Sequence, residues 1–261
     1  MVKYKRLPME TLVNTRDLGG YAAEGGKITK YGVFLRTDCP IGISEKDIKT
    51  LQDYGVTLSI DLRGTDEVEK TPSGMIGVPG HTYRHMPINE DHQIIRSEGG
   101  RKPGGPPPPP KNMENFDLGD SYIGFLEEGK EWVRKVITLC AEWEGCVMFH
   151  CFIGKDRAGT IAGLILGAVG VGMTDILMDY SASMSCLRPK YDKMGASFLP
   201  QKRGRPDYSW GFFGSVPESM EAVWYYLQEK YGGYAGYLKA CGVTEETIQK
   251  LKDKLLEDPT D

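Results

Sequence analysis

The sequence lacks the features that mark several large classes of protein. Its longest mostly apolar run, Ile161 to Met173, is interrupted by glycine and is shorter than the roughly 20 residues that a membrane-spanning helix needs. The basic N-terminus is not followed by the apolar core of a signal peptide, so we expect no leader. Positive charge is not in excess: 32 Lys and Arg residues against 36 Asp and Glu residues give a net charge of −4, which disfavours a protein that binds nucleic acid.

Cysteine and histidine are also few and scattered. The six cysteines include no Cys-x-x-Cys pair, and no spacing between Cys and His is typical of a zinc site. We therefore expect no metal site, and reduced, mostly buried cysteines of which at most one has a chemical role. This pattern favours a cytoplasmic protein, although export without a leader would leave no mark in the sequence. The six are Cys39, Cys140, Cys146, Cys151, Cys186 and Cys241.

The composition that remains is that of a folded domain. The 261 residues are 40% hydrophobic and 26% charged, which is ordinary for a globular protein with its own core. Short β-branched and aromatic runs alternate with helical patterns, which predicts an α/β fold with a central, mostly parallel sheet flanked by helices. The predicted strands are Val33–Arg36, Val56–Leu62, Thr82–Ile88 and Cys146–His150. The predicted helices extend from Ser44 to Tyr54 and over Ser121–Trp143, Arg157–Val171, Thr174–Met184, Pro217–Tyr231 and Thr244–Glu257.

Two segments break this pattern, and we interpret both as insertions in a single domain of residues 1–261. The first, near residues 91–115, contains the five prolines Pro106 to Pro110, which favour polyproline II over a helix or a central strand. It can be an exposed linker, a lid over a site, or a ligand for a proline-recognising partner domain. The second, residues 187–216, combines the basic run Lys202-Arg203-Gly204-Arg205 with several aromatic residues, which we expect to pack on the domain.

The segment from His150 to Thr160 carries the strongest chemical signal. It follows a predicted strand, leads into a predicted helix, and places five residues between Cys151 and Arg157. A loop between a strand and a helix N-terminus directs backbone N–H groups at one point, where they bind an anion and stabilise a thiolate. Arg157 can hold two phosphate oxygens with its planar guanidinium, and Gly154 lets the backbone turn close to the ligand.

This arrangement is typical of the phosphate loop of cysteine-dependent phosphatases, in which the cysteine attacks phosphorus. A lone cysteine is more often a buried, inert thiol, and two residues at a fixed spacing recur by chance. The strand before the loop, Gly154 within it and the helix after it agree with one another, and they favour the phosphate loop over both alternatives.

The loop resembles the His-Cys-x-x-Gly-Lys-Asp-Arg loop of a bacterial tyrosine phosphatase family of broad specificity, the MptpB/LipA-like group. Other segments resemble the same family in the same order, so the similarity spans most of the chain. They are Asn14–Tyr21, Phe34–Thr37, Ile60–Arg63 with Glu67, Asp179–Ser181, and the stretch from Tyr231 to Leu251. The resemblance implies a tyrosine or dual-specificity phosphatase fold. It also implies hydrolysis of phosphotyrosine through a cysteinyl-phosphate, with phosphoserine, phosphothreonine or phosphoinositides as further substrates.

The resemblance also implies roles for individual residues. Cys151 is the nucleophile, Arg157 holds the phosphate, and Asp156 is the general acid, which must be protonated to act. An acidic residue is favourable at a helix start in any case, so a pairing of Asp156 with Lys155 stays open. Lys155 either projects toward the mouth of the site or lies in solvent. The residues expected to surround the phosphate are Phe152, Ile153, Gly154, Lys155 and Ala158.

Three further residues are expected to support the site. His150 is expected to orient the loop by hydrogen bonds, and Asp17 to belong to a structural turn near the site. Asp61 ends a predicted strand at the carboxyl edge of the sheet. There it is a second candidate acid, but it is better suited to a cap or an ion pair. Because the loop and Arg157 supply the positive charge that a metal would bring, we expect no metal and no organic cofactor.

The sequence departs from the family at the residue after the loop arginine, which is usually Thr or Ser and is Ala158 here. The missing hydroxyl normally helps the sulfur to leave when the intermediate is hydrolysed, and Thr160 lies on another helix face. We hypothesise that the cysteinyl-phosphate accumulates. Ala158 also keeps open a phosphate-binding pseudophosphatase with little turnover. Sulfur transfer and arsenate reduction use similar loops, but they differ in loop length, charge or redox cysteines.

Overall fold

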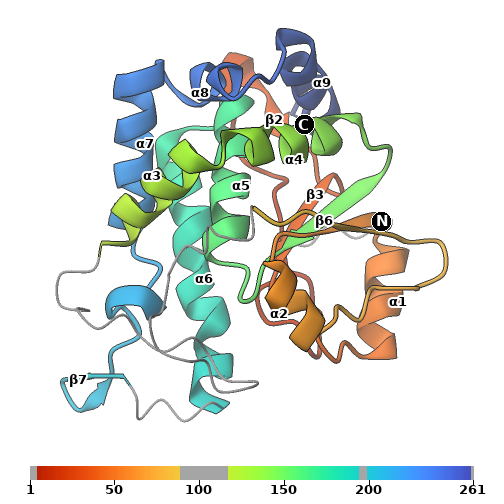
Figure 1. Ribbon diagram of the computed structural model, residues 1–261, viewed down its shortest axis with the longest axis vertical. Helices are drawn as coiled ribbons and strands as arrows, with labels where there is room; N and C mark the ends of the chain where they lie inside the picture. The colour runs from red at the N-terminus through yellow and green to blue at the C-terminus, as the bar shows by residue number, and fades with distance from the viewer. Residues whose placement is uncertain (1–4, 89–116, 194–198, 260–261) are drawn as a thin grey trace.

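The structure, a computed structural model, describes residues 5–88, 117–193 and 199–259 (Figure 1). Its strands are β1 (Arg16–Asp17), β2 (Ile28–Thr29), β3 (Phe34–Thr37), β4 (Val56–Asp61), β5 (Thr82–His85), β6 (Cys146–His150), β7 (Gln201–Lys202), β8 (Arg205–Pro206) and β9 (Leu256–Glu257). Its α-helices are α1 (Glu45–Asp53), α2 (Thr65–Lys70), α3 (Leu118–Glu128), α4 (Lys130–Glu142), α5 (Asp156–Ala168), α6 (Met173–Lys193), α7 (Pro217–Tyr231), α8 (Tyr234–Ala240) and α9 (Glu245–Leu255).

A five-stranded sheet forms the centre of the fold, with the strand order β1-β3-β6-β4-β5. The four strands from β3 to β5 in this order are parallel, and β1 is antiparallel to β3. The predicted α/β fold with a mostly parallel sheet is confirmed, and each of the four predicted strands is present. The strand before the candidate loop, β6, lies in the middle of the sheet.

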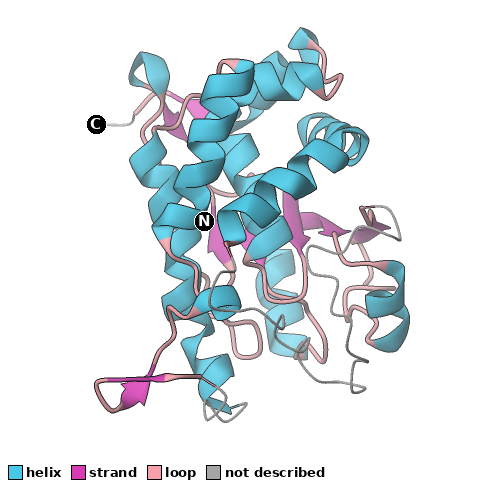
Figure 2. Ribbon diagram, turned by 60° about the vertical axis from the view of Figure 1, so that its left-hand side comes forward, coloured by secondary structure: helices cyan, strands magenta, loops and turns pink. Residues whose placement is uncertain are grey.

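The side chains of β6 alternate between two hydrophobic cores. Val147 and Phe149 face a large core that they share with helices α3 to α9, whereas Cys146 and Met148 face a smaller core with α1 and the N-terminal segment. Figure 2 shows the strands between these helices. Because both faces of the sheet are covered, β6 is buried along its whole length.

The prediction of one helix over Ser121–Trp143 is wrong, because the chain forms two helices that part at Gly129. A Cβ atom at Gly129 would lie 2.8 Å from the Phe125 carbonyl oxygen and 2.4 Å from Ile88 Cδ1, so the close packing at this break favours glycine. The indole of Trp132 donates to the Met86 carbonyl at 2.7 Å and holds the second helix to the same segment. The helical spacing of apolar residues does not reveal such a break, because the same spacing continues from the first helix into the second.

Helix α6 is longer than the predicted helix Thr174–Met184 and continues through Pro189 to Lys193. The expectation of an irregular segment from residue 187 is therefore wrong for its first part. Buried side chains at helical spacing explain the extension. They are Tyr180, Ser183, Leu187 and Tyr191. Helices α2 and α8 were not predicted, because segments of six and seven residues carry little periodic signal.

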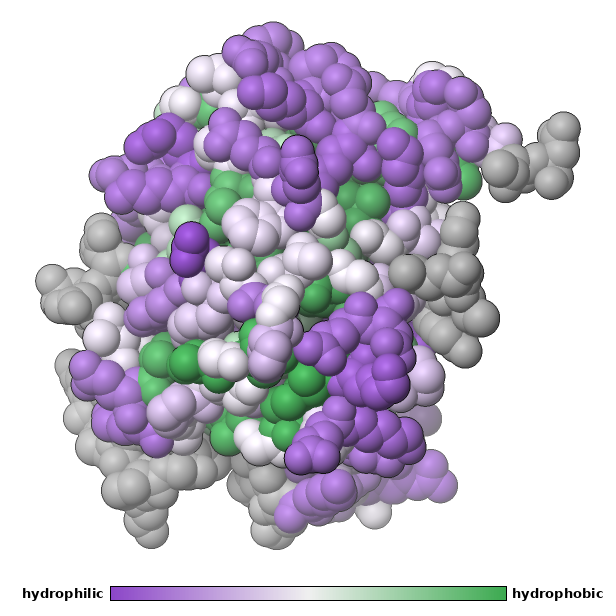
Figure 3. Space-filling model, turned by 90° about the vertical axis from the view of Figure 1, so that its right-hand side faces the viewer, coloured by the Kyte–Doolittle hydropathy of each residue, from purple (hydrophilic) through white to green (hydrophobic). Residues whose placement is uncertain are grey.

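Charged side chains cover the outer faces of α4 and α9, where Lys135 lies 2.8 Å from Glu131 and Lys250 lies 2.8 Å from Glu246. Figure 3, which views the molecule from the right-hand side of Figure 1, shows hydrophilic residues over its upper part. Across the described ranges, no helix has the length and apolar character required to cross a membrane. The proline-rich stretch near residues 91–115 lies outside the described residues, so its role stays a prediction.

Candidate active site

The candidate phosphate loop begins at the carboxyl end of the central strand. Strand β6 ends at His150 and α5 begins at Asp156, so Cys151 opens the loop and Arg157 lies in the first turn of the helix. Only 1% of the Cys151 surface is exposed. The strand, loop and helix N-terminus meet as the sequence predicts, at the edge of a parallel sheet where α/β proteins bind ligands.

Four consecutive carbonyl groups of the loop accept hydrogen bonds from residues outside it. The pairs are Cys39 N with Phe152 O (3.1 Å), Asn14 Nδ2 with Ile153 O (2.9 Å), Arg36 Nη2 with Gly154 O (2.7 Å) and Arg36 Nη2 with Lys155 O (3.2 Å). A trans peptide points its C=O and the next N–H in opposite directions. Holding the carbonyls on the outside therefore turns the N–H groups toward the inside of the loop, where they can surround an anion.

Gly154 is required by the backbone of the loop and by its packing. Its φ is +70°, a left-handed conformation that side chains disfavour. A Cβ atom there would lie 2.3 Å from the Thr37 carbonyl oxygen and 2.7 Å from Asp38 N. The loop therefore lies directly against the end of β3, and only glycine fits.

Arg36, which holds two of the loop carbonyls, is itself held by Asp179 of α6. Arg36 Nη1 lies 2.5 Å from Asp179 Oδ2, and Arg16 Nε lies 3.5 Å from Oδ1. Burial by itself would raise the pKa of Asp179, but the charges of Arg36 and Arg16 lower it to about 2. Arg36 and Asp179 belong to family motifs of the sequence, but neither was assigned to the site. For Arg36, the sequence did contain a signal of such a role, because a charged residue there lies in a predicted strand that is otherwise apolar.

Arg157 is oriented by Glu67 of α2. Its Nη1 lies 2.7 Å from Glu67 Oε2, its Nη2 lies 3.3 Å from Oε1, and Nη1 also lies 3.3 Å from the Leu62 carbonyl oxygen. Burial lowers the pKa of Arg157, but Glu67 and Cys151 outweigh burial and raise it. The two-point contact fixes the plane of the guanidinium. Glu67 was noted in the family motif but given no role.

Positive groups gather around Cys151. The side chains of Arg36, Lys155 and Arg157 each interact electrostatically with it. Each of these cations also contacts a carboxylate, which holds it in place: Arg36 contacts Asp179, Lys155 contacts Asp156 and Arg157 contacts Glu67.

Lys155 neither projects toward the mouth of the site nor lies in solvent, so both expectations for it are wrong. The side chain is fully buried, its Nζ donates to the Gly214 carbonyl at 2.8 Å, and it lies 3.4 Å from Asp156 Oδ1. Burial lowers the pKa of Lys155, although Asp156 acts in the opposite direction. Lys155 therefore ties the loop to the segment before α7, which lies 59 residues further along the chain and could not be identified from the sequence.

Asp156 belongs to a buried chain of hydrogen bonds. The Tyr122 hydroxyl donates to Asp156 Oδ1 at 2.5 Å and lies 2.8 Å from the Tyr180 hydroxyl. Burial raises the pKa of both tyrosines, and the negative charge of Asp156 adds to the effect. The pairing with Lys155 that the sequence left open is present, and it reaches the same oxygen, Oδ1.

Asp61 and His150 lie side by side at the ends of β4 and β6, with His150 Nδ1 3.8 Å from Asp61 Oδ1. Asp61 also contacts Arg63 (Oδ2 to Nη2, 2.7 Å) and the Tyr83 hydroxyl (2.9 Å). Burial by itself would raise the pKa of Asp61, but His150 and Arg63 lower it to about 2. Asp61 is therefore ionised at neutral pH, which fits the predicted ion pair and not the second candidate acid.

The two remaining support residues occupy different surroundings. His150 is buried, and its Nδ1 lies 3.3 Å from the Cys151 carbonyl oxygen, at the start of the loop. Asp17 accepts hydrogen bonds from the Tyr54 hydroxyl (2.6 Å) and from the N–H groups of Gly19 (2.6 Å) and Gly32 (2.8 Å). None of these three partners belongs to the loop, so Asp17 braces the N-terminal segment.

Ala158 is fully buried on α5. The Thr160 hydroxyl donates to the Asp156 carbonyl at 3.0 Å. It therefore already has an acceptor within its own helix, which supports the expectation that Thr160 does not replace the hydroxyl missing at position 158.

The α/β sheet, with a loop that contains Cys151 and Arg157 after its central strand, has the architecture expected of the cysteine-phosphatase fold. The model of the tyrosine phosphatase family matches residues 7–257, and the chain belongs to that family. It is a protein tyrosine phosphatase, a phosphoric monoester hydrolase that acts on phosphoproteins.

Individual relatives agree with this assignment. A tyrosine-protein phosphatase of Nostoc commune is 32% identical over 236 residues, which cover 85% of this chain and 74% of the relative. A putative tyrosine-protein phosphatase of Cupriavidus necator is 31% identical over 180 residues, 68% of this chain and 62% of the relative. The triple specificity protein phosphatase PtpB of Mycobacterium tuberculosis is 26% identical over 234 residues, 79% of this chain and 84% of the relative. The resemblance to the bacterial broad-specificity group is confirmed.

Proposed function

We propose that the protein hydrolyses phosphotyrosine through a covalent cysteinyl-phosphate. The Cys151 sulfur attacks phosphorus, an S–P bond forms, and the bond to the leaving phenolic oxygen breaks. Water then attacks phosphorus, the S–P bond breaks, and inorganic phosphate leaves. The observation that carries the proposal is the set of four loop carbonyls held from outside by Cys39, Asn14 and Arg36, since it directs the loop N–H groups at the place where charge develops.

The proposed roles of the charged residues follow from their contacts. Arg157, held in one plane by Glu67, can present its guanidinium to two equatorial phosphate oxygens. We infer that the cations around Cys151 balance the negative charge that the sulfur and phosphate bring together in the transition state. The loop itself binds the phosphate through the backbone of residues 152–158.

Asp156 is the proposed general acid, which donates a proton to the leaving oxygen and later accepts one from the attacking water. Its contacts with Tyr122 and Lys155 both reach Oδ1 and leave Oδ2 as the oxygen to face a substrate. The variant Asp156→Asn is expected to slow the release of phenol from phenyl phosphate far more than the release of p-nitrophenol, because the better leaving group needs less help from an acid. Equal slowing of both substrates would assign Asp156 to a structural role.

The proposed substrates extend beyond phosphotyrosine to phosphoserine, phosphothreonine or phosphoinositides. One relative is named a triple specificity phosphatase, which supports this breadth. All six cysteines are free and buried, as in a reducing compartment, which supports the cytoplasm as the place of action. The alternative of a phosphate-binding pseudophosphatase rests on Ala158 alone.

Rapid mixing with p-nitrophenyl phosphate across pH 5 to 8 tests the proposal, with Cys151→Ser as the blank. Release of p-nitrophenolate that depends on Cys151 supports the cysteine mechanism. Release that is no greater than in the blank at any pH would favour the pseudophosphatase, which should still bind phosphate tightly enough to be measured by calorimetry.

A further inference from the structure

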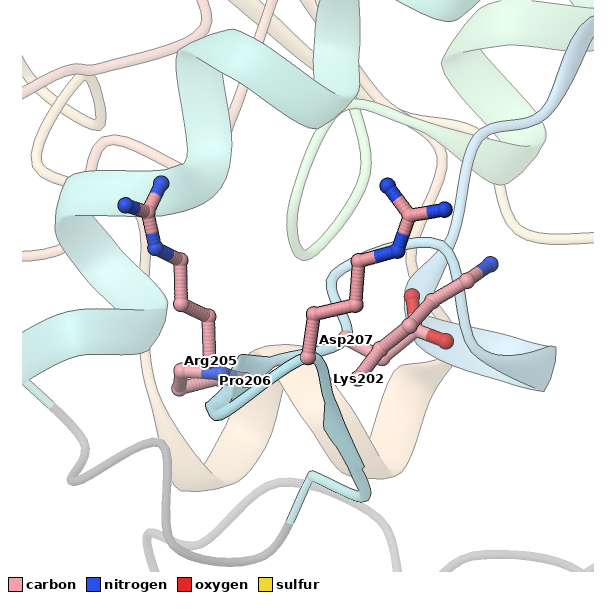
Figure 4. A pocket seen from close by; sticks show the side chains of 5 residues that line it. Lys202, Arg205, Pro206 and Asp207 are labelled. Atoms are coloured by element: carbon pink, nitrogen blue, oxygen red, sulfur yellow. The ribbon is translucent and has the colours of Figure 1, made fainter.

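The β7–β8 hairpin concentrates positive charge that the proposed chemistry does not use. Lys202, Arg203 and Arg205 line a hollow of about 570 Å³ together with Pro206 and Asp207 (Figure 4). Three cations and one carboxylate give this hollow a net charge of +2. Residues 201–205 are exposed, and none of the three cations forms an ion pair with a described residue.

The turn of the hairpin holds an arginine where the backbone disfavours one. Arg203 has a φ of 54° and Gly204 a φ of 73°, and Arg203 is the one residue other than glycine with a positive φ among the described residues. A two-residue turn with both values positive prefers Asn-Gly or Gly-Gly. A bulky side chain there is unusual and points to a use for the side chain itself.

The two residues that flank the turn also oppose each other. Lys202 and Arg205 are directly paired in the register of the antiparallel strands, which places their side chains on one face. Figure 4 shows both side chains rising from the hairpin, Arg205 toward the left and Lys202 toward the right. Like charges at facing positions destabilise a strand pair, and an anion bound between them would remove the repulsion.

The segment that carries the hairpin is anchored to the candidate phosphate loop. Ile153 of the loop packs on a cluster formed by Leu187, Tyr191, Leu199 and Phe213, and Tyr208 and Trp210 pack on the same cluster. The Lys155 ammonium holds the Gly214 carbonyl. Segments on both sides of the hairpin therefore pack on the loop or on the cluster that contacts it.

We propose that the hairpin hollow binds a second phosphate group on a phosphoprotein substrate while the first occupies the Cys151 loop. A phosphate monoester carries a charge of about −1.5 to −2 at neutral pH, which matches the net +2 of the hollow. Arginine guanidinium groups bind phosphate through paired hydrogen bonds. This site would make a doubly phosphorylated segment a better substrate than a singly phosphorylated one. The proposal rests on the proposed phosphatase function and specifies its substrate class.

An anionic membrane is the less suitable partner. Lipid surfaces recruit clusters of about four to eight Lys and Arg residues, whereas the hairpin has three. Its exposed residues 201–205 include no apolar side chain that could enter the lipid.

The test uses the full chain and a triple variant, Lys202→Gln, Arg203→Asn and Arg205→Gln. Asparagine at 203 preserves the turn, because it accepts a positive φ and precedes glycine. The matched control removes three exposed lysines from α4, α8 and α9, through Lys135→Gln, Lys239→Gln and Lys250→Gln. It changes the net charge equally, so it separates the hairpin from general electrostatic attraction.

The substrates are phosphotyrosine peptides in which a phosphoserine lies about two to eight residues from the phosphotyrosine. Each intervening residue adds about 3.3 Å when the peptide is extended. For the wild type we expect one separation at which kcat/KM exceeds that of the singly phosphorylated peptide about tenfold, since a second charge-assisted contact contributes about this much. The triple variant loses that gain and the control keeps it. All three proteins hydrolyse p-nitrophenyl phosphate alike, because it has no second phosphate.

Equilibrium binding separates this proposal from the proposed phosphatase function. In the Cys151→Ser background, the doubly phosphorylated peptide should bind about tenfold more tightly than the singly phosphorylated one, which corresponds to about 1.4 kcal/mol, and the triple substitution should abolish the difference. This result holds even if turnover is absent. Equal binding of the two peptides, or a preference that survives the triple substitution, overturns the proposal. Loss of binding to phosphatidylserine vesicles without any change in peptide binding would assign the hairpin to membranes instead.

Discussion

Glu67 and Arg157 form a two-point ion pair in which each carboxylate oxygen of Glu67 contacts one guanidinium nitrogen of Arg157, at 2.7 and 3.3 Å. The pair joins the short helix α2 to the first turn of α5. It fixes the orientation of the side chain proposed to hold the phosphate. The geometry of the site therefore depends on a residue that belongs to a different element from the loop.

The first prediction concerns this ion pair. Glu67→Ala is expected to lower kcat/KM for p-nitrophenyl phosphate by about 100-fold, because a misplaced catalytic group can cost that much. Glu67→Gln keeps one oxygen acceptor and should lose less, about tenfold. Glu69→Gln, at an exposed position of the same helix, is the matched control. Inhibition by inorganic phosphate should weaken in parallel with the loss of activity, whereas a purely structural role of Glu67 would lower the melting temperature and leave the phosphate affinity of the folded enzyme intact.

The second prediction concerns Gly154. Gly154→Ala places a Cβ atom against the Thr37 carbonyl at a positive φ, so the loop must shift. We expect activity to fall by at least about 100-fold and the free energy of unfolding to fall by about 1 to 3 kcal/mol. Gly172→Ala is the control, because a Cβ atom added to Gly172, just before α6, would meet nothing within 4 Å. Full activity of Gly154→Ala would show that the loop geometry is not needed.

The third prediction concerns the buried Ala158. Restoring a hydroxyl should speed hydrolysis of the cysteinyl-phosphate and raise steady-state turnover, and the stoichiometric burst of p-nitrophenolate that we expect for the wild type in rapid mixing should become smaller. Ala158→Thr restores the residue usual in the family, and Ala158→Ser adds less volume to this fully buried position. Unchanged turnover in both variants, with the fold intact by circular dichroism, would contradict the proposed accumulation of the intermediate.

The fourth prediction concerns pH and Asp179. Its pKa is lowered from 3.8 to about 2 in the folded protein. Its contribution to the free energy of unfolding is therefore present above the unfolded pKa and is lost as pH falls toward 2. That contribution is on the order of 2 kcal/mol. Asp179→Asn leaves Arg36 and Arg16 without their carboxylate and should destabilise the protein by about 3 to 5 kcal/mol at neutral pH.

Urea unfolding at a series of pH values checks this fourth prediction. The difference in the free energy of unfolding between wild type and Asp179→Asn should shrink as pH falls from about 4 to about 2, because the wild type also loses its carboxylate charge. Asp175→Asn, on the same helix, is the control. A difference that stays constant over this range would show that the charge of Asp179 does not hold Arg36.

The strand, loop and helix around Cys151 could be predicted from the amino-acid sequence. They depend on residues that are adjacent in the chain: a buried strand, a glycine, and a helix whose first turn carries Asp156 and Arg157. Local spacing also indicated the four parallel strands, because each is a short apolar run. The family resemblance supplied the proposed roles, since no single spacing distinguishes an acid from an ion-pair partner.

The residues that hold the loop in place are brought together by the tertiary structure, and no local sequence pattern indicates them. Arg36 contacts Asp179, which is 143 residues away in the sequence, and Arg157 contacts Glu67, which is 90 residues away. Local sequence patterns do not indicate which residues so far apart will come into contact. The break at Gly129, the burial of Lys155 and the extension of α6 have the same origin. Each depends on what another segment places against the residue, and burial and hydrogen bonding with distant partners outweigh local preference there.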